Sequence, residues 1–190
     1  STRLFFRHSR QSAGGWRELP LPVVGGKTYG MLWHGDVYAL ASGANGPYGI
    51  YRGRFDGTGQ LNWSTIREPR ENPAVRAFGI VNNRLLVHLS RGGTSEFVVC
   101  LLDGHGCRRA NLPTGGAATH PLGLEGSGDG WCNYSSETSP NTVYRVSVTE
   151  DKVEPVLAPK VSWEPSVYST DSFEFPLSDG ARSKLFLVRK

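Results

Sequence analysis

A pattern of short strands and polar turns repeats along this chain with a period of about 46 to 48 residues. The first copy runs from Tyr29 to Glu68, the second from Arg76 to Pro113, and the third from His120 to Pro159. Each copy contains short apolar or alternating runs separated by turns rich in Gly, Asn and Asp. Four strands within such a period are typical of one blade of a β-propeller.

Three sets of anchor residues define the period. The first set lies in the polar turn before the second strand: Asp36, Asn83 and Asp129. The second set lies in the third strand: Tyr51, Val99 and Arg145. The third set marks the following hairpin: Asp56-Gly57, Asp103-Gly104 and Glu150-Asp151. A stretch of ten residues, Glu68 to Ala77, is the one place where we considered a short turn of helix.

The N-terminal residues follow the same period. Leu4–Arg7 corresponds to a third strand, Ser12–Gly15 to its turn, and Trp16–Leu19 to a fourth strand. We therefore expect an all-β chain: a partial β-propeller of about three and a half four-stranded antiparallel blades, with a C-terminal β-hairpin. The expected divisions are residues 1–20 for the outer half of one blade, 21–70, 71–115 and 116–160 for whole blades, and 161–190 for a linker and the hairpin.

The expected hairpin has a simple pattern. Phe173, Phe175 and Leu177 alternate with polar residues, Ser178-Asp179-Gly180 forms a turn, and Leu185–Val188 forms the return strand. Blades bury their faces against neighbouring blades, so an arc of this size has two open faces that favour self-association. Either the terminal hairpin closes a four-bladed ring, or, as we expect, the rest of the ring lies outside this chain.

Composition limits the function classes. The net charge is +4 and the pI about 9.1, but the arginines are dispersed and form no basic run, so we expect no nucleic-acid partner. No apolar stretch approaches the length of a membrane span, and no signal peptide is visible, so we expect no membrane partner.

The three cysteines form no C-x-x-C pair. Cys100 and Cys132 lie in apolar strand-like runs, which favours buried free thiols, although a Cys100–Cys107 bridge across a turn stays open. A reduced compartment follows, and we expect a cytoplasmic location with a periplasmic one as the alternative.

The sequence shows no complete catalytic constellation. Ser127 comes nearest to a G-x-S-x-G nucleophile elbow, but Glu125 replaces the first glycine, and Ser95 fits less well. The carboxylate pairs Glu68/Glu71 and Glu150/Asp151 fall in expected loops. The histidines show no metal-ligand spacing: His8, His34, His88, His105 and His120. We therefore expect no catalytic, cofactor-binding or metal-binding residue on this chain, and no cofactor.

Two other residue classes have structural interpretations. The glycine pairs do not match phosphate-binding loops and are expected in turns: Gly25-Gly26, Gly92-Gly93 and Gly115-Gly116. The tryptophans are expected mainly in strands, packed between blades: Trp16, Trp33, Trp63, Trp131 and Trp163. His34 and His105 are expected in turns, and His88 on a blade face.

The stretch VYSTDSFEFPLSDGARSKLFLVRK, residues 167–190, resembles the junction in prolyl oligopeptidases at which the propeller ends and the α/β-hydrolase domain begins. VYALASGANGPYGIYRGRFD is similar to a blade of that family, and SSETSPNTVYRVSV is similar to its last blade. VEPVLAPKVSWEPSVYSTDSFEF follows that segment as the family's linker does. The resemblance covers nearly the whole chain in one register.

This resemblance implies the second half of a seven-bladed propeller plus the first hairpin of the hydrolase domain. The family's catalytic triad would then lie beyond residue 190, and the chain would be a non-catalytic fragment. It would cap the hydrolase domain and gate the access of short proline-containing peptides, which would be its partners. The alternative is a stand-alone small propeller that binds a peptide, a glycan or a protein. A glycosidase-type propeller would need clustered carboxylates, which we do not find.

Overall fold

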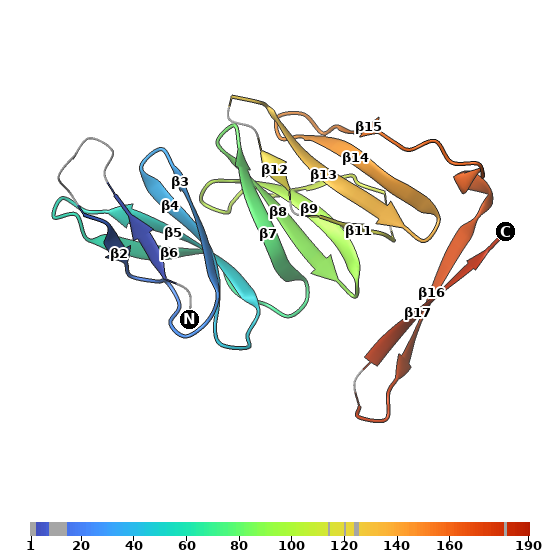
Figure 1. Ribbon diagram of the computed structural model, residues 1–190, viewed down its shortest axis with the longest axis horizontal. Coiled ribbons are helices and arrows are strands. Elements are labelled where there is room, and N and C mark those ends of the chain that lie inside the picture. Colours follow the sequence, from blue (N-terminus) through green and yellow to red (C-terminus); the bar gives the residue numbers. More distant parts are fainter. Residues whose placement is uncertain (1–2, 8–14, 114, 120, 124–125, 181) are drawn as a thin grey trace. The chain divides into compact units, whose positions relative to one another are not determined.

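The computed structural model describes residues 3–7, 15–113, 115–119, 121–123, 126–180 and 182–190. Within these residues the regular structure is antiparallel β-sheet, apart from one 3-10 turn, Pro165–Val167. The chain divides into two compact units, Ser1–Val75 and Arg76–Lys190. Figure 1 shows the first in blue to cyan and the second in green to red. The expectation of an all-β chain is confirmed.

The first unit contains a two-stranded and a four-stranded arrangement. Strands β1 (Leu4–Phe6) and β2 (Arg17–Leu19) pair antiparallel. Four strands follow in the order in which they pair: β3 (Thr28–Trp33), β4 (Asp36–Ser42), β5 (Tyr48–Phe55) and β6 (Leu61–Arg67). A bridge between Tyr48 and Val75 makes the start of β7 (Ala74–Val81) a further neighbour of β5. The turn joining β1 to β2 was predicted over Ser12–Gly15, of which only Gly15 lies within the described residues.

A small apolar cluster joins these two arrangements. Leu19 of β2, Val37 of β4 and Leu61 at the start of β6 are each 6% exposed and lie at its centre. Partly buried side chains pack around them: Leu4, Phe6, Phe55 and Trp63. Alternate residues of a strand point to the same face. Leu4 and Phe6 of β1 therefore point to one face, and with Leu19 of β2 they pack against the cluster.

The second unit contains two further sheets. The first has the order β7, β8 (Arg84–Arg91), β9 (Thr94–Leu101) and β10 (Arg108–Ala110). The second is built on three strands in the order β13 (Asp129–Ser136), β14 (Ser139–Ser147) and β15 (Val153–Leu157). Its inner position is divided between two short strands, β11 (Ala117–Ala118) and β12 (Leu122–Gly123), which both pair with β13. Pro121 lies between them and has no N–H for a continuous ladder.

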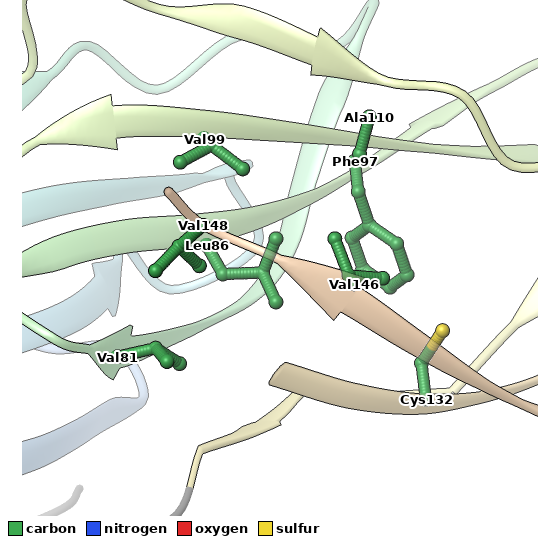
Figure 2. Close-up of a cluster of buried hydrophobic side chains, with 8 residues drawn as sticks. All are labelled: Val81, Leu86, Phe97, Val99, Ala110, Cys132, Val146 and Val148. Carbon is green, nitrogen blue, oxygen red and sulfur yellow. The ribbon is translucent and has the colours of Figure 1, made fainter. Parts of the chain in front are cut away.

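These two sheets pack face to face through a buried cluster. The cluster contains Val81, Leu86, Phe97, Val99 and Ala110 from the first sheet, and Cys132, Val146 and Val148 from β13, β14 and the residue that follows β14 (Figure 2). Leu86, Phe97 and Val146 are fully buried. Neither sheet could bury this face alone, which is the physical basis of the repeat.

The terminal hairpin forms where the sequence predicts it. Strand β16 (Ser169–Pro176) pairs with β17 (Arg182–Arg189) in continuous register, and the Gly180 N–H donates to the Leu177 carbonyl across the turn. Phe173 lies opposite Leu185, and both are about half exposed. Phe175 and Leu187 extend this apolar stripe on the same face.

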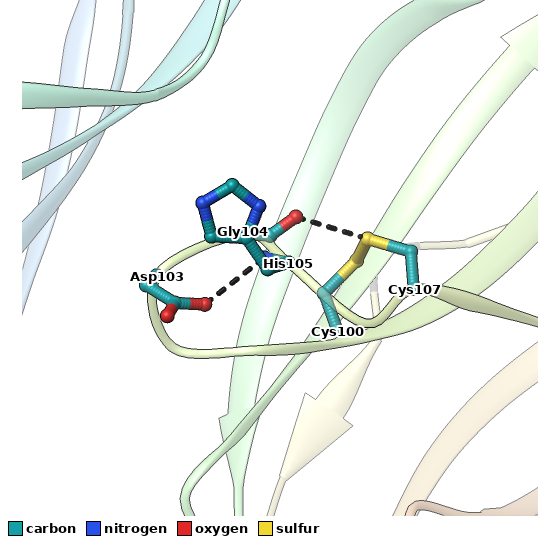
Figure 3. Close-up of a disulfide and its surroundings, with 5 residues drawn as sticks. All are labelled: Cys100, Asp103, Gly104, His105 and Cys107. Carbon is teal, nitrogen blue, oxygen red and sulfur yellow. Dashed lines mark hydrogen bonds between the residues drawn. A yellow bond between two sulfur atoms is a disulfide. The ribbon is translucent and has the colours of Figure 1, made fainter.

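The structure corrects the expectation for Cys100, which is not a free thiol. Cys100 and Cys107 form a disulfide across the turn between β9 and β10 (Figure 3). Cys132 is the free, buried cysteine that the sequence predicts. The apolar residues around Cys100 and Cys132 in the sequence do not distinguish a bonded cysteine from a free one. The disulfide depends on the register between β9 and β10, which places Cys107 opposite Cys100. The short helix considered for Glu68–Ala77 is also wrong, since β6 reaches Arg67 and β7 begins at Ala74.

Gly116 tests how closely the second unit is packed. A Cβ built there would lie 2.3 Å from the Ser135 carbonyl oxygen and 2.4 Å from the Tyr134 ring. Because a backbone atom cannot move aside, we expect Gly116→Ala to destabilise the protein by about 1–3 kcal/mol. Urea unfolding followed by fluorescence measures this. Gly128→Ala is the control, since its Cβ would meet nothing within 4 Å, and equal losses in both variants would contradict the packing.

Candidate functional site

The hydroxyl of Ser127 is bonded to the backbone of Asp129 and is not placed as a nucleophile. Its Oγ accepts the N–H of Asp129 at 3.0 Å and lies 3.3 Å from the Asp129 carbonyl oxygen. The side chain therefore closes the turn that begins β13, as serine hydroxyls do in many turns.

Ser95 and His88 form a hydrogen-bonded pair that the sequence did not reveal. His88 Nε2 lies 2.8 Å from Ser95 Oγ, which also accepts the N–H of Ala118 at 2.8 Å. Ser95 donates its own N–H to the Gly116 carbonyl, so this residue of β9 is bonded to the segment containing β11. His88 is only 5% exposed and its ring packs against Phe97. The prediction that His88 lines a blade face is confirmed, and the pair joins two sheets.

The other candidate residues have structural positions. His34 lies in a turn with φ +48°, and His105 lies in an exposed turn, as predicted. Both carboxylate pairs are exposed. His8 and His120 lie outside the described residues. In the part of the chain that the structure describes, no group of three His, Cys, Asp or Glu side chains is arranged for a metal ion. Among the same residues, no helix has the length and apolar character of a membrane crossing.

The glycine pairs lie in turns as predicted, with positive φ at Gly25, Gly92, Gly93 and Gly115. The tryptophan prediction is confirmed in part. Trp63 packs against the cluster of the first unit, and its Nε1 donates to the Pro20 carbonyl at 2.8 Å. Trp16 is 66% exposed and Trp163 39% exposed, so these two are not buried between sheets. Both lie outside the long strands, Trp16 directly before β2 and Trp163 between β15 and the 3-10 turn.

A polar pocket lies at one end of the sheet formed by β13, β14 and β15. Its volume is about 330 Å³, and its lining comes from the starts of β13 and β15, from β14 and from the β14–β15 turn: Gly128, Asp129, Arg145, Ser147, Thr149, Glu150, Lys152 and Glu154. Three carboxylates and two cations line it, so we take it as the candidate site of the second unit.

Ion pairs across the strands organise this pocket. Arg145 of β14 contacts Glu154 of β15, and its other nitrogen lies 3.8 Å from Asp129 of β13. Lys152 Nζ lies 2.5 Å from Glu154 Oε1. The hydrogen bond from Lys152, followed by that from Arg145, lowers the pKa of Glu154, and the Glu154 carboxylate raises the pKa of Arg145. The carboxylate and the guanidinium therefore stay charged together.

Arg108 fastens the rim of this pocket from the neighbouring sheet. Its NH2 donates to the carbonyls of Ser147 at 2.9 Å and Glu150 at 2.5 Å, and its NH1 lies 3.1 Å from Asp151 Oδ1. One guanidinium thus holds the β14–β15 turn to β10. The sequence indicated Arg108 only as one of several dispersed arginines, because the contact joins residues about 40 positions apart.

The aspartate–arginine pair at the pocket also occurs in the first unit. Asp36 contacts Arg52, whose Nε lies 2.7 Å from the carboxylate, as Asp129 contacts Arg145. Arg52 stands opposite Tyr38 in its ladder, and Arg145 opposite Trp131. The anchors Tyr51, Val99 and Arg145 do lie in third strands, but Arg52 rather than Tyr51 is the counterpart of Arg145.

Successive four-stranded antiparallel repeats, two of which pack face to face in the second unit, are the architecture of a part of a β-propeller. The family model described as prolyl oligopeptidase, N-terminal beta-propeller domain, matches residues 1–159. The chain therefore belongs to the prolyl oligopeptidase family, as a part of its propeller domain. No curated protein matches the chain.

Solved structures agree on the fold. A prolyl endopeptidase, studied as one of two for the role of inter-domain dynamics in catalysis and specificity, is 24% identical with a TM-score of 0.83, covering 99% of this chain and 27% of that one. Prolyl oligopeptidase B from Galerina marginata is 15% identical with a TM-score of 0.77, covering 92% and 25%. Oligopeptidase B from Trypanosoma brucei with bound antipain is 14% identical with a TM-score of 0.70, covering 85% and 25%. The chain spans about a quarter of their length.

Substitution of Ser95 tests whether the Ser95–His88 pair has a structural or a catalytic role. We expect Ser95→Ala to destabilise the protein by about 1–3 kcal/mol, because the Ala118 N–H loses its acceptor. We also expect no labelling of Ser95 by a fluorophosphonate probe, measured by mass spectrometry. Labelling that disappears in Ser95→Ala would instead identify a reactive serine.

Glu154 gives a test of the pocket's electrostatics. Because its pKa is lowered, the carboxylate stays charged, and the ion pairs persist, as the pH falls through the ordinary range of a glutamate. Lys152→Gln should raise the pKa of Glu154 towards its ordinary value, which a carboxyl-carbon NMR titration measures. Lys160→Gln, an exposed lysine outside the pocket, is the control and should change nothing. An unchanged Glu154 titration in Lys152→Gln would contradict the pairing.

Proposed function

We propose that this chain is a non-catalytic propeller portion of a prolyl oligopeptidase-like serine peptidase, which caps a hydrolase domain and gates short proline-containing peptides. The match of the propeller family model to residues 1–159 carries this proposal. The absence of a serine–histidine–acid constellation among the described residues supports a non-catalytic role, because Ser95 and Ser127 are both engaged in structural hydrogen bonds.

The terminal hairpin supplies the second argument. Its stripe of Phe173, Phe175, Leu185 and Leu187 is 41–55% exposed along one face. An isolated two-stranded hairpin is at best marginally stable in water. We propose that a hydrolase domain covers this stripe, so that the hairpin attaches the propeller to the catalytic part.

Gating follows from how such a cap would act. A propeller seated over an active site admits substrate through its channel or when the two domains separate, and either route favours small substrates. One of the similar structures, a prolyl endopeptidase, was studied for the role of inter-domain dynamics in catalysis and specificity. We extend that link to this chain as part of the proposal.

Two further expectations belong to this proposal. We propose the blade divisions at residues 1–20, 21–70, 71–115 and 116–160, with the linker and hairpin at 161–190. The cytoplasmic location stays a prediction, and the Cys100–Cys107 disulfide supports the periplasmic alternative, since stable disulfides form in oxidising compartments.

The test uses the intact peptidase, that is, this chain joined to its hydrolase domain. We expect hydrolysis of a short Gly-Pro chromogenic peptide and little hydrolysis of unfolded casein. Phe173→Ser should lower the activity by about tenfold, because a polar side chain in the apolar stripe weakens domain docking. Glu174→Ser, on the opposite face of β16, is the matched control and should retain activity.

Two results would contradict the proposal. Equal activity of Phe173→Ser and Glu174→Ser would show that the stripe does not attach a catalytic domain. A reading frame that encodes no hydrolase domain after Lys190 would instead favour a stand-alone binding module.

A further inference from the structure

We propose that the Cys100–Cys107 disulfide is a reversible redox switch that, through Arg108, controls the order of the pocket rim formed by residues 147–152. Three observations carry this inference: the position of the disulfide, the shortness of β10, and the contacts of Arg108. It does not rest on the proposed function, because it concerns contacts within the second unit of this chain.

The disulfide is placed where a reductant can reach it. Cys100 is 2% exposed at the end of β9, whereas Cys107 is exposed directly before β10. Arg108 pairs with Val99, so the same register puts Cys107 opposite Cys100 (Figure 3). A dithiol can therefore attack the Cys107 sulfur from solvent while the Cys100 sulfur departs into the protein.

The strand that follows the disulfide is short. Strand β10 has three residues and pairs only with β9, as the outermost strand of its sheet. The covalent link fixes its first residue beside Val99. Once the link opens, this edge strand is held only by its short ladder with β9, by buried Ala110 and by the polar contacts of Arg108 and Arg109, so it opens locally more often.

The first residue of β10 is Arg108, so the disulfide is adjacent in the chain to the contact between the two sheets. The Arg108 guanidinium holds the Ser147 and Glu150 carbonyls and the Asp151 carboxylate. Ser147 and Glu150 line the pocket. Loss of order in β10 therefore removes the contact that fixes the pocket rim.

The corresponding turn of the first unit is closed without a disulfide. There, Asp56 Oδ1 accepts the hydroxyl of Thr58 at 2.6 Å and the N–H groups of Thr58 at 2.9 Å and Gln60 at 3.0 Å. The hydrogen bond from the Thr58 hydroxyl, followed by that from the Gln60 N–H, lowers the pKa of Asp56 to about 2. A β-hairpin turn at this position can therefore be closed by hydrogen bonds alone. The disulfide adds a chemically reversible closure at the one turn that carries Arg108.

The redox step is a complete exchange. A dithiol thiolate attacks Cys107 Sγ, the S–S bond breaks, and Cys100 leaves as a thiolate that takes up a proton. The second thiol of the dithiol then attacks the mixed disulfide, releases the Cys107 thiol and closes the reductant's own disulfide. Two electrons pass to the protein, and the dithiol is oxidised. In the disulfide form Cys107 Sγ lies 3.2 Å from the Gly104 carbonyl oxygen, to which the thiol formed on reduction can donate.

Hydrogen exchange measured by mass spectrometry on the purified full chain, with and without dithiothreitol, tests the switch. We expect reduction to speed amide exchange in residues 147–152 by about tenfold, while strands β3 to β5 exchange as before. Alkylation of the folded, reduced protein should label the exposed Cys107 but not Cys132, whose burial raises its thiol pKa to about 12.

Three variants distinguish a local effect on residues 147–152 from a general increase in amide exchange. In the double variant Cys100→Ser/Cys107→Ser, the amides of residues 147–152 should exchange as fast as in the reduced protein, and dithiothreitol should not change that rate. Arg108→Gln should show fast exchange at residues 147–152 in both redox states. Arg109→Gln is the matched control, because Arg109 lies next in β10 but pairs with Glu96, and it should respond as the natural chain does.

Three results would overturn the inference. The first is a disulfide that dithiothreitol does not open in the folded protein. The second is unchanged exchange at residues 147–152 after reduction confirmed by mass. The third is an equal rise in exchange throughout the chain, which would show global unfolding instead of a local switch.

Discussion

The packing of one β-sheet on the next is the interaction on which the second unit depends. Leu86 and Phe97 of one sheet meet Cys132 and Val146 of the other in a buried cluster, and neither face could remain in water without a large cost. The same constraint explains the period of the sequence, since each repeat must form one sheet that its neighbours cover. It also explains why polar contacts between the sheets, at Ser95 and Arg108, lie around this cluster.

The fold was predictable from the sequence because its signals are local. Alternation, turn glycines and the aspartate before the second strand are read over a few residues, so the strands of each repeat and the hairpin turn at Ser178-Asp179-Gly180 are found where expected. The division of the third inner strand at Pro121 was missed, although proline is a local signal, because the short flanking strands carry little pattern of their own.

The candidate site was much less predictable. The Arg108 contacts, the His88–Ser95 pair and the Cys100–Cys107 disulfide depend on how particular strands lie against each other. A register one residue different would turn each side chain to the other face. That sensitivity also explains why Tyr51 was aligned with Arg145 although Arg52 is its counterpart. Long-range polar contacts are therefore the part of this molecule that requires a structure.

Size-exclusion chromatography with light scattering on the 190-residue chain, with a Gly-Pro chromogenic assay on the same fractions, tests the central claim most directly. A non-catalytic part of a propeller has sheet faces that lack their neighbours, so the account predicts self-associated species without peptidase activity. A stable monomer would contradict the open arc and favour a closed ring that acts as a binding module. Activity that follows the protein peak would contradict the non-catalytic assignment.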